Sequence, residues 1–96
     1  MMITGTPEEQ QATRKRILNR LRRAQGQLNG VITAMEAGGS CREVVTQLAA
    51  VTSALDKAGF AIISSAMRDC VVDPEATEAA EGLTADELEK LFLSLA

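Results

Sequence analysis

Apolar residues recur in alternating steps of three and four along two long stretches of the chain. They stand at Ile17, Leu21, Ala24, Leu28, Val31 and Met35, and again at Val44, Leu48, Val51, Leu55, Ala58 and Ile62. This spacing places an apolar stripe on one face of each of two long helices, which we predict over residues 7–37 and 41–72. A shorter pattern of the same kind predicts a helix over 84–95, and residues 74–81 are expected to form a short acidic turn of helix.

Each predicted helix begins with a capping box, in which a hydroxyl residue is followed three positions later by a glutamate. The three pairs are Thr6 with Glu9, Ser40 with Glu43, and Thr84 with Glu87. Gly38 and Gly39 separate the first two helices, and Asp73–Pro74 ends the second because proline cannot continue a helix. These signals make the chain all-α, with three helices in one domain over residues 1–96.

The connection between the two long helices is short enough to make them an antiparallel hairpin. Both apolar stripes are wider than one neighbouring helix needs. Two hairpins pairing as a four-helix-bundle dimer would cover them, and we prefer this arrangement to a monomeric three-helix bundle.

Charge is distributed unevenly along the chain, although the net charge is only −3. Six basic residues fall in one short segment: Arg14, Lys15, Arg16, Arg20, Arg22 and Arg23. A basic element in an acidic chain still provides an electrostatic footprint for DNA, and the alternative is a solvated helix face. The chain has no histidine, which makes most hydrolytic enzymes unlikely candidates.

The two cysteines, Cys41 and Cys70, lie 29 positions apart on one predicted helix. At 100° per residue they share one side of it, but the rise of 1.5 Å per residue separates them by roughly 43 Å. One chain cannot bring the two sulfurs together, whereas antiparallel pairing of the helix with its symmetry mate places Cys41 beside Cys70 of the other protomer. Cys41, at the first helical position, is the better thiolate. The equally weighted alternative is two small core residues.

No basic segment leads into an apolar run at the N-terminus, and no stretch is expected to be apolar enough to span a membrane. We therefore expect a cytoplasmic protein. In that compartment cysteines are more often working thiols or inert core residues than structural disulfides.

The segment RLRRAQGQLNG at residues 20–30, followed by Cys41, Gln47–Leu48 and Cys70, resembles the copper-sensitive operon repressor family (CsoR/RcnR/FrmR). The resemblance covers roughly residues 16–72. It implies a dimer built on the first two helices, a homotetramer formed as a dimer of dimers, and binding of operator DNA that is lost when an inducer binds. It also implies a DNA-binding role for Arg20 and Lys57, which match family positions; Arg14, Arg16, Arg22 and Arg23 are further candidates on charge alone.

The residues around the cysteines indicate a branch within this family. Copper sensors of the family use a Cys–His–Cys set, and the histidine position is Ala66 here. Nickel and cobalt sensors rely on additional histidines, and formaldehyde sensors typically lack the second cysteine. This chain has two cysteines and no histidine. This set, with the sequence around residues 25–30 and 62–64, resembles the persulfide-sensing CsoR-like sulfurtransferase repressor (CstR) branch, in which polysulfides link the two cysteines across the dimer.

The sequence thus predicts a repressor, not an enzyme, that binds operator DNA when reduced. It releases DNA when Cys41 and Cys70 of opposite protomers are bridged by reactive sulfur. No cofactor is expected. The first alternative is a copper(I)-responsive repressor with Cys41 and Cys70 as metal ligands. A small thiol sulfur carrier without DNA binding and a plain helical interaction module are the others.

Overall fold

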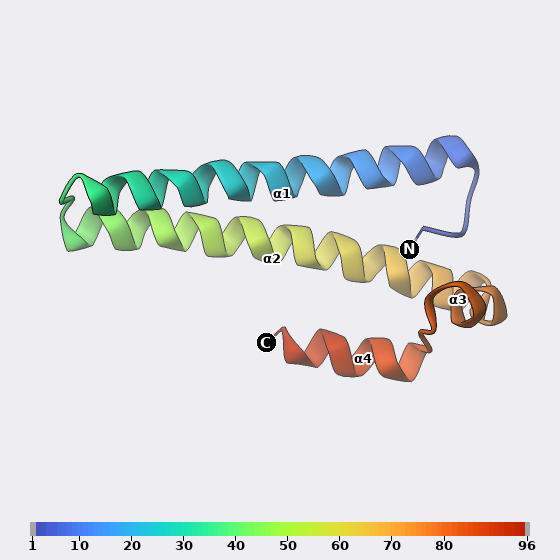
Figure 1. Cartoon of the computed structure of the whole chain (residues 1–96). Coiled ribbons are helices and arrows are strands. Elements are labelled where there is room, and N and C mark those ends of the chain that lie inside the picture. The colour runs from blue at the N-terminus through green and yellow to red at the C-terminus, as the bar shows by residue number, and fades with distance from the viewer. Residues whose placement is uncertain (1, 96) are drawn as a thin grey trace. The chain divides into compact units, whose positions relative to one another are not determined.

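The computed structural model describes residues 2–95, which form four helices and no strand. They are α1 (Pro7–Glu36), α2 (Cys41–Val72), α3 (Pro74–Glu81) and α4 (Ala85–Ser94) (Figure 1). The all-α prediction is confirmed. The predicted range of α2 is met, and those of α1 and α4 differ by one residue at their ends. Residues 1 and 96 of the predicted domain lie outside the described residues, and the single domain stays a prediction.

The described residues form four helices where three were counted from the sequence, because the short acidic turn of helix expected at 74–81 is the eight-residue helix α3. The Asp73 side chain accepts a hydrogen bond from the Ala76 N–H at 3.0 Å, and Pro74 occupies the first turn. Gly82 then ends the helix in the left-handed region at φ 62°. Asp73–Pro74 thus stops α2 and starts α3, since proline at a first helical position costs no hydrogen bond.

Local hydrogen bonds confirm the three predicted helix starts. The Glu9 N–H donates to Thr6 Oγ1 at 3.1 Å, and the Glu43 N–H donates to Ser40 Oγ at 3.2 Å. At α4 the Glu87 N–H donates to Thr84 Oγ1 at 3.2 Å. These bonds satisfy backbone donors that the first turn of a helix leaves without partners.

The chain divides into two compact units, of which one comprises residues 17–59. In it the C-terminal part of α1 and the N-terminal part of α2 run side by side in opposite directions (Figure 1). Small side chains dominate the seam between them: its buried residues are Ile17, Ala24, Val31, Ala34, Val51, Ala54 and Ala58. The leucines of the predicted stripes do not enter it. Leu28, Leu48 and Leu55 are 45%, 47% and 51% exposed.

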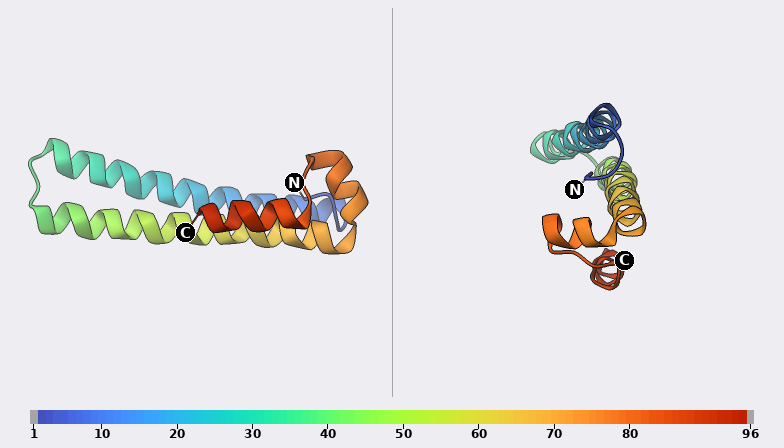
Figure 2. Two further views of the ribbon diagram at one scale, coloured as in Figure 1. Left: turned by 90° about the horizontal axis from the view of Figure 1, so that it is seen from below. Right: turned by 90° about the vertical axis from the view of Figure 1, so that its right-hand side faces the viewer.

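The other unit joins the start of the chain, up to Arg16, to the part from Phe60 onward. Its apolar core is a cluster of Ala66, Cys70 and Leu88, against which Ile63 and Leu83 pack. Helix α4 therefore runs back along the C-terminal part of α2, as Figures 1 and 2 show. This packing explains why α4 is amphipathic: Leu88 is only 2% exposed, whereas Leu91 is 53% exposed.

By length and composition alone α2 could cross a membrane, since an 18-residue window reaches a mean hydropathy of 1.2. This corrects the expectation that no stretch is apolar enough. It is weak evidence for a membrane segment, because the core helix of a soluble bundle has the same composition.

Candidate sensing thiols and basic cavity

Cys41 is the first residue of α2 and its side chain is exposed. Ser40 precedes it and caps the helix through the Glu43 N–H, which fixes where α2 begins. The first-turn position follows from the Gly38–Gly39 break, where Gly38 adopts a positive φ of 72°. Cys41 is therefore accessible to a reagent in solution, as an attacking thiol must be.

Cys70 lies near the opposite end of α2 and is buried, with 6% of its surface exposed. Ala66 stands one turn before it, and Leu88 of α4 packs in the same cluster. Both cysteines are free thiols. The two sites thus differ in access, and the predicted pairing of Cys41 with Cys70 of another protomer stays a prediction.

The described residues do not supply a metal site within one protomer. Nowhere in residues 2–95 do three His, Cys, Asp or Glu side chains gather in a way that could hold a metal ion. Ala66, on the turn before Cys70, is buried and has no donor atom.

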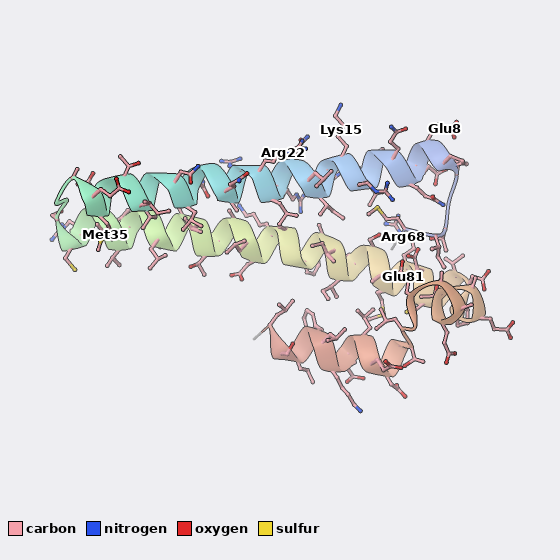
Figure 3. All side chains as sticks on the ribbon, viewed as in Figure 1. Glu8, Lys15, Arg22, Met35, Arg68 and Glu81 are labelled. Atoms are coloured by element: carbon pink, nitrogen blue, oxygen red, sulfur yellow. The ribbon has the colours of Figure 1, made fainter. Side chains whose placement is uncertain are left out.

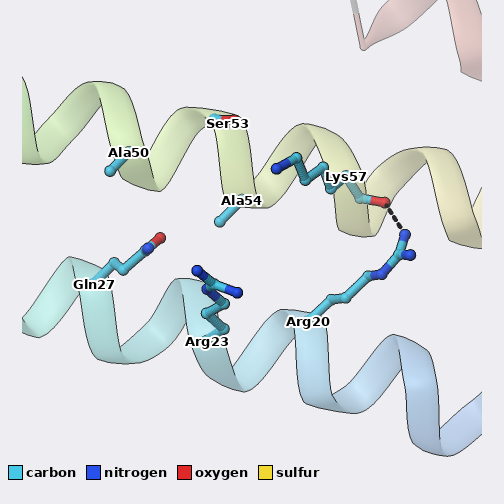
Figure 4. Close-up of a pocket in the computed structure, with 7 residues that line it drawn as sticks. All are labelled: Arg20, Arg23, Gln27, Ala50, Ser53, Ala54 and Lys57. Atoms are coloured by element: carbon cyan, nitrogen blue, oxygen red, sulfur yellow. Dashed lines mark hydrogen bonds between the residues drawn. The ribbon is translucent and has the colours of Figure 1, made fainter.

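A basic cavity of about 380 Å³ lies between α1 and α2 in the unit of residues 17–59 (Figure 4). Its lining consists of Arg20, Arg23, Gln27, Ala50, Ser53, Ala54 and Lys57. Arg20 and Arg23 reach from α1 toward α2, and the Lys57 side chain extends along α2 beside them. All seven lie within the described part of the chain and none is acidic, so the cavity has a positive potential that suits an anion.

One hydrogen bond holds part of this cavity in place. Arg20 Nη1 donates to the backbone carbonyl oxygen of Lys57 at 3.2 Å, across 37 positions of the chain. The bond joins the two helices and leaves the other guanidinium N–H groups of Arg20 for a ligand, because arginine carries five donors. Of the predicted DNA-binding residues, the structure brings together Arg20, Arg23 and Lys57.

The remaining predicted basic residues do not line this cavity. Arg22 is exposed on α1 and projects away from α2 (Figure 3). Arg14 and Arg16 are exposed and belong to the other compact unit. Their DNA-binding role stays a prediction that rests on charge.

Two glutamines between the long helices were not predicted as site residues. Gln27 and Gln47 line a smaller hollow with Gly30 and Ala50, and the Oε1 atom of each glutamine is buried without a hydrogen-bond partner. Gln27 also lines the basic cavity. Both glutamines fall beside the predicted stripes, and no pattern in the sequence indicated their burial.

Asp69 is a further buried polar residue that sequence reasoning missed. Its carboxylate accepts hydrogen bonds from the N–H groups of Met2, Ile3 and Thr4 at 2.9, 3.2 and 3.3 Å, and from Thr4 Oγ1 at 2.7 Å. Burial raises the pKa of the Asp69 carboxyl, but the bonds from the Thr4 hydroxyl and the three N–H groups outweigh it and hold the pKa below its ordinary value. Asp69 directly precedes Cys70.

The family profile of metal-sensitive transcriptional repressors matches residues 13–94, a range that includes both cysteines and the whole basic cavity. The chain belongs to this family. The resemblance found in the sequence to the copper-sensitive operon repressors is thereby confirmed, and the family is one of transcriptional repressors.

Among relatives, the chain is similar to the copper-sensing transcriptional repressor CsoR of Mycobacterium ulcerans, with 38% identity over 53 residues covering 55% of this chain and 45% of that protein. CsoR proteins of Mycobacterium bovis and Mycobacterium tuberculosis are 30% identical over 63 residues, covering 66% of this chain and 53% of theirs. The chain thus spans about half the length of these relatives. No solved structure matches it.

Proposed function

We propose that this member of the metal-sensitive repressor family binds operator DNA in its reduced form. It releases DNA when reactive sulfur bridges Cys41 to Cys70 of another protomer. It acts in the cytoplasm as a homo-oligomer, a dimer or a dimer of dimers. The observation that carries the DNA-binding part is the cavity lined by Arg20, Arg23 and Lys57, whose lining contains no acidic residue.

The cavity fits a phosphodiester group better than a base edge. Phosphates are bound mainly by arginine and lysine, and such contacts position a protein on DNA without reading its sequence. Ser53 adds a hydroxyl to the same lining. Because Arg20 is already anchored to α2 through the Lys57 carbonyl, less side-chain freedom is lost when a phosphate binds.

The apolar surface of the long helices supports self-association. Leu28 and Ile32 on α1 are 45% and 47% exposed, and Leu48 and Leu55 on α2 are similarly exposed. Soluble monomers rarely leave so many large apolar side chains on adjacent helices uncovered. An antiparallel pairing of two hairpins covers them and brings Cys41 of one protomer to Cys70 of the other.

In the proposed sulfur chemistry the exposed thiol, Cys41, reacts first. The Cys41 thiolate attacks a sulfur atom of an inorganic polysulfide, an S–S bond of the polysulfide breaks, and a shorter polysulfide leaves with the electron pair. Cys70 of the partner then attacks a sulfur atom of the chain on Cys41. It expels the outer sulfur as hydrosulfide and leaves a di-, tri- or tetrasulfide bridge. The two thiols are oxidised, the sulfane sulfur is reduced, and the thiol protons pass to solvent.

A copper(I)-responsive repressor with the same two thiolates is the second candidate. It is favoured by the relatives, which are copper sensors, and by the affinity of thiolates for copper(I). The missing third ligand at Ala66 counts against it. A sulfur carrier without DNA binding is the third candidate, and the basic cavity counts against that.

Mass spectrometry of the intact, non-reduced protein tests the first candidate, and DNA-binding measurements then separate the other two. After anaerobic treatment with sodium tetrasulfide, we expect a covalent dimer that carries added sulfur atoms and is absent from Cys41→Ala and Cys70→Ala. An unmodified monomer mass contradicts the sulfur proposal. Copper(I) titration of the protein bound to the DNA upstream of the gene that encodes it, monitored by fluorescence anisotropy, then tests the second candidate. Lack of DNA binding by both the reduced and the tetrasulfide-treated protein supports the third.

A further inference from the structure

We propose that Asp69 couples the state of the Cys70 sulfur to the docking of the N-terminal strap, residues 2–5, so that modifying Cys70 releases the strap. This rests on the proposed function insofar as Cys70 is a sensing thiol. Asp69 acts as a positioning residue: it reacts with nothing and holds a segment that follows the movement of its neighbour.

Most of the hydrogen bonds that hold the strap go to one side chain. Three successive backbone N–H groups, of Met2, Ile3 and Thr4, donate to the Asp69 carboxylate, and the Thr4 hydroxyl donates to the same group. Asp69 is 2% exposed and Met2 is 5% exposed, so water cannot easily replace these bonds. Successive N–H groups converging on one carboxylate need it at one position, because hydrogen bonds weaken steeply with misalignment.

The backbone of the strap adopts conformations that need support. Met2 has a φ of 62°, in the left-handed region that is unfavourable for a residue with a side chain. Gly5 has a φ of 87°, and a Cβ atom there would lie 2.9 Å from Glu9 Oε2. A strained backbone persists only while surrounding contacts hold it. The strap should therefore leave its position once the bonds to Asp69 are lost.

Cys70 follows Asp69 in the chain, and its side chain lies on a different face of the same helical turn. Its side chain packs in the cluster with Ala66 and Leu88 and is 6% exposed. A close-packed cluster does not accept an added sulfur or methyl group without moving its surroundings. The last turn of α2 ends at Val72, and α3 begins two residues later at Pro74. We expect that turn to shift and to carry the Asp69 carboxylate away from the strap.

The consequence lies at the start of α1. The strap leads into that helix at Pro7, and its next turns carry the exposed Arg14, Lys15 and Arg16. Releasing the strap removes the long-range bonds that order this end of the basic segment. Modification of the Cys70 sulfur would in this way change the order of a basic surface that contains no cysteine.

The test uses the full chain with Cys41→Ser and a defined reagent, methyl methanethiosulfonate. The Cys70 thiolate attacks the sulfenyl sulfur of the reagent, a new S–S bond forms, and methanesulfinate leaves with the electron pair of the broken bond. NMR measures amide hydrogen exchange at Ile3 and Thr4 before and after reaction, with complete modification verified by mass. We expect exchange at both amides to accelerate at least tenfold on modification.

Two variants and one control complete the experiment. Asp69→Asn should show the fast exchange in both states, and Thr4→Val, which spares the turn of Cys70, should accelerate Ile3 in the free-thiol state. Asp56→Asn, an exposed position on α2, should behave as the parent. Slow exchange at Ile3 and Thr4 after full modification overturns the inference, since α4 alone would then have moved aside. The readout needs neither DNA nor a sulfur inducer, so its failure is distinguishable from failure of the proposed function.

Discussion

Lys57 illustrates how a single charge can be assigned to a site only when its neighbours are known. It lies between Asp56 and Ala58 in the sequence, isolated from the basic segment of α1, yet it lines the cavity with Arg20 and Arg23. The resemblance to the family indicated Lys57, and the cavity gives that indication a physical reason. Arg23, proposed on charge alone, lies beside it.

Replacing Lys57 by alanine should weaken DNA binding and reduce its salt dependence. Loss of one phosphate contact lowers the slope of log K against log salt by about 1 and weakens binding similarly for different DNA sequences. Fluorescence anisotropy at several salt concentrations measures both. Lys90→Ala on α4, outside the cavity, is the matched control and should leave the slope unchanged. An unchanged slope for Lys57→Ala would contradict the proposal that the cavity binds a phosphate.

The Asp69 carboxylate should make stability depend on pH. Its pKa in the folded chain is lower than the ordinary value of 3.8, so its stabilising effect is complete above about pH 4 and is lost as the pH falls through the folded pKa. Asp69→Asn should cost about 2 kcal/mol at pH 7, because three N–H donors lose a charged acceptor.

Chemical denaturation between pH 7 and pH 3 tests this expectation. As the pH falls, the free energy of unfolding of the parent should decrease toward that of Asp69→Asn, so that the two curves converge at acid pH. Asp56→Asn, which also removes one carboxylate, should run parallel to the parent. A constant difference between the parent and Asp69→Asn across this range would show that the carboxylate charge has no part in holding the strap.

At the scale of elements, α4 decides the access to Cys70. The helix contributes Leu88 to the cluster around the thiol, while Leu91 and Phe92 of the same helix remain half exposed. A buried thiol reacts only when its cover opens, and the rate then reflects the free energy of that opening. Cys41, exposed at the start of α2, provides an internal reference in the same molecule.

Leu88→Ala should expose Cys70. Truncating a buried leucine costs about 2–5 kcal/mol, which here weakens the packing of α4 against α2. We expect iodoacetamide to alkylate Cys70 about tenfold faster or more, with the rate at Cys41 unchanged, as followed by peptide mass spectrometry. Leu91→Ala, one turn along and exposed, is the control. Parent protein in which both cysteines react equally fast would contradict the burial of Cys70.

At the scale of the whole molecule, the division between small buried and large exposed apolar residues predicts association. Ala24, Ala54 and Ala58 fill the seam between the two long helices, which lets their backbones approach closely. Leu28, Leu48 and Leu55 remain outside it. Their burial against a second hairpin would contribute about 25 cal/mol for each Å² removed from water.

Leu55→Lys should dissociate the oligomer. A lysine placed within an apolar interface must either leave it or bring its charge into it, and both outcomes weaken association. Sedimentation velocity should show a smaller species than the parent, with helical content retained in circular dichroism. Asp56→Lys adds the same side chain at the neighbouring position and should keep the parent's oligomeric state. A parent that sediments as a monomer at all concentrations would contradict the prediction.

The sequence by itself determined the features whose causes are local. Thr6, Ser40 and Thr84 start helices because each hydroxyl accepts a hydrogen bond from an N–H three residues later, and this needs no distant partner. The long apolar periods predicted two long helices for the same reason. The family resemblance rested on a motif contained in these helices.

Only the tertiary structure decided what depends on residues far apart in the chain. The choice of alanines over leucines for the seam follows from how close two helices approach, which periodicity does not express. The bonds of Asp69 to residues 2–4 span more than sixty positions, and that of Arg20 to Lys57 spans 37. The burial of Cys70, unlike the exposure of Cys41, follows from where α4 packs. A pattern read along the chain records what each residue prefers, and the distances between remote residues arise only when the helices pack.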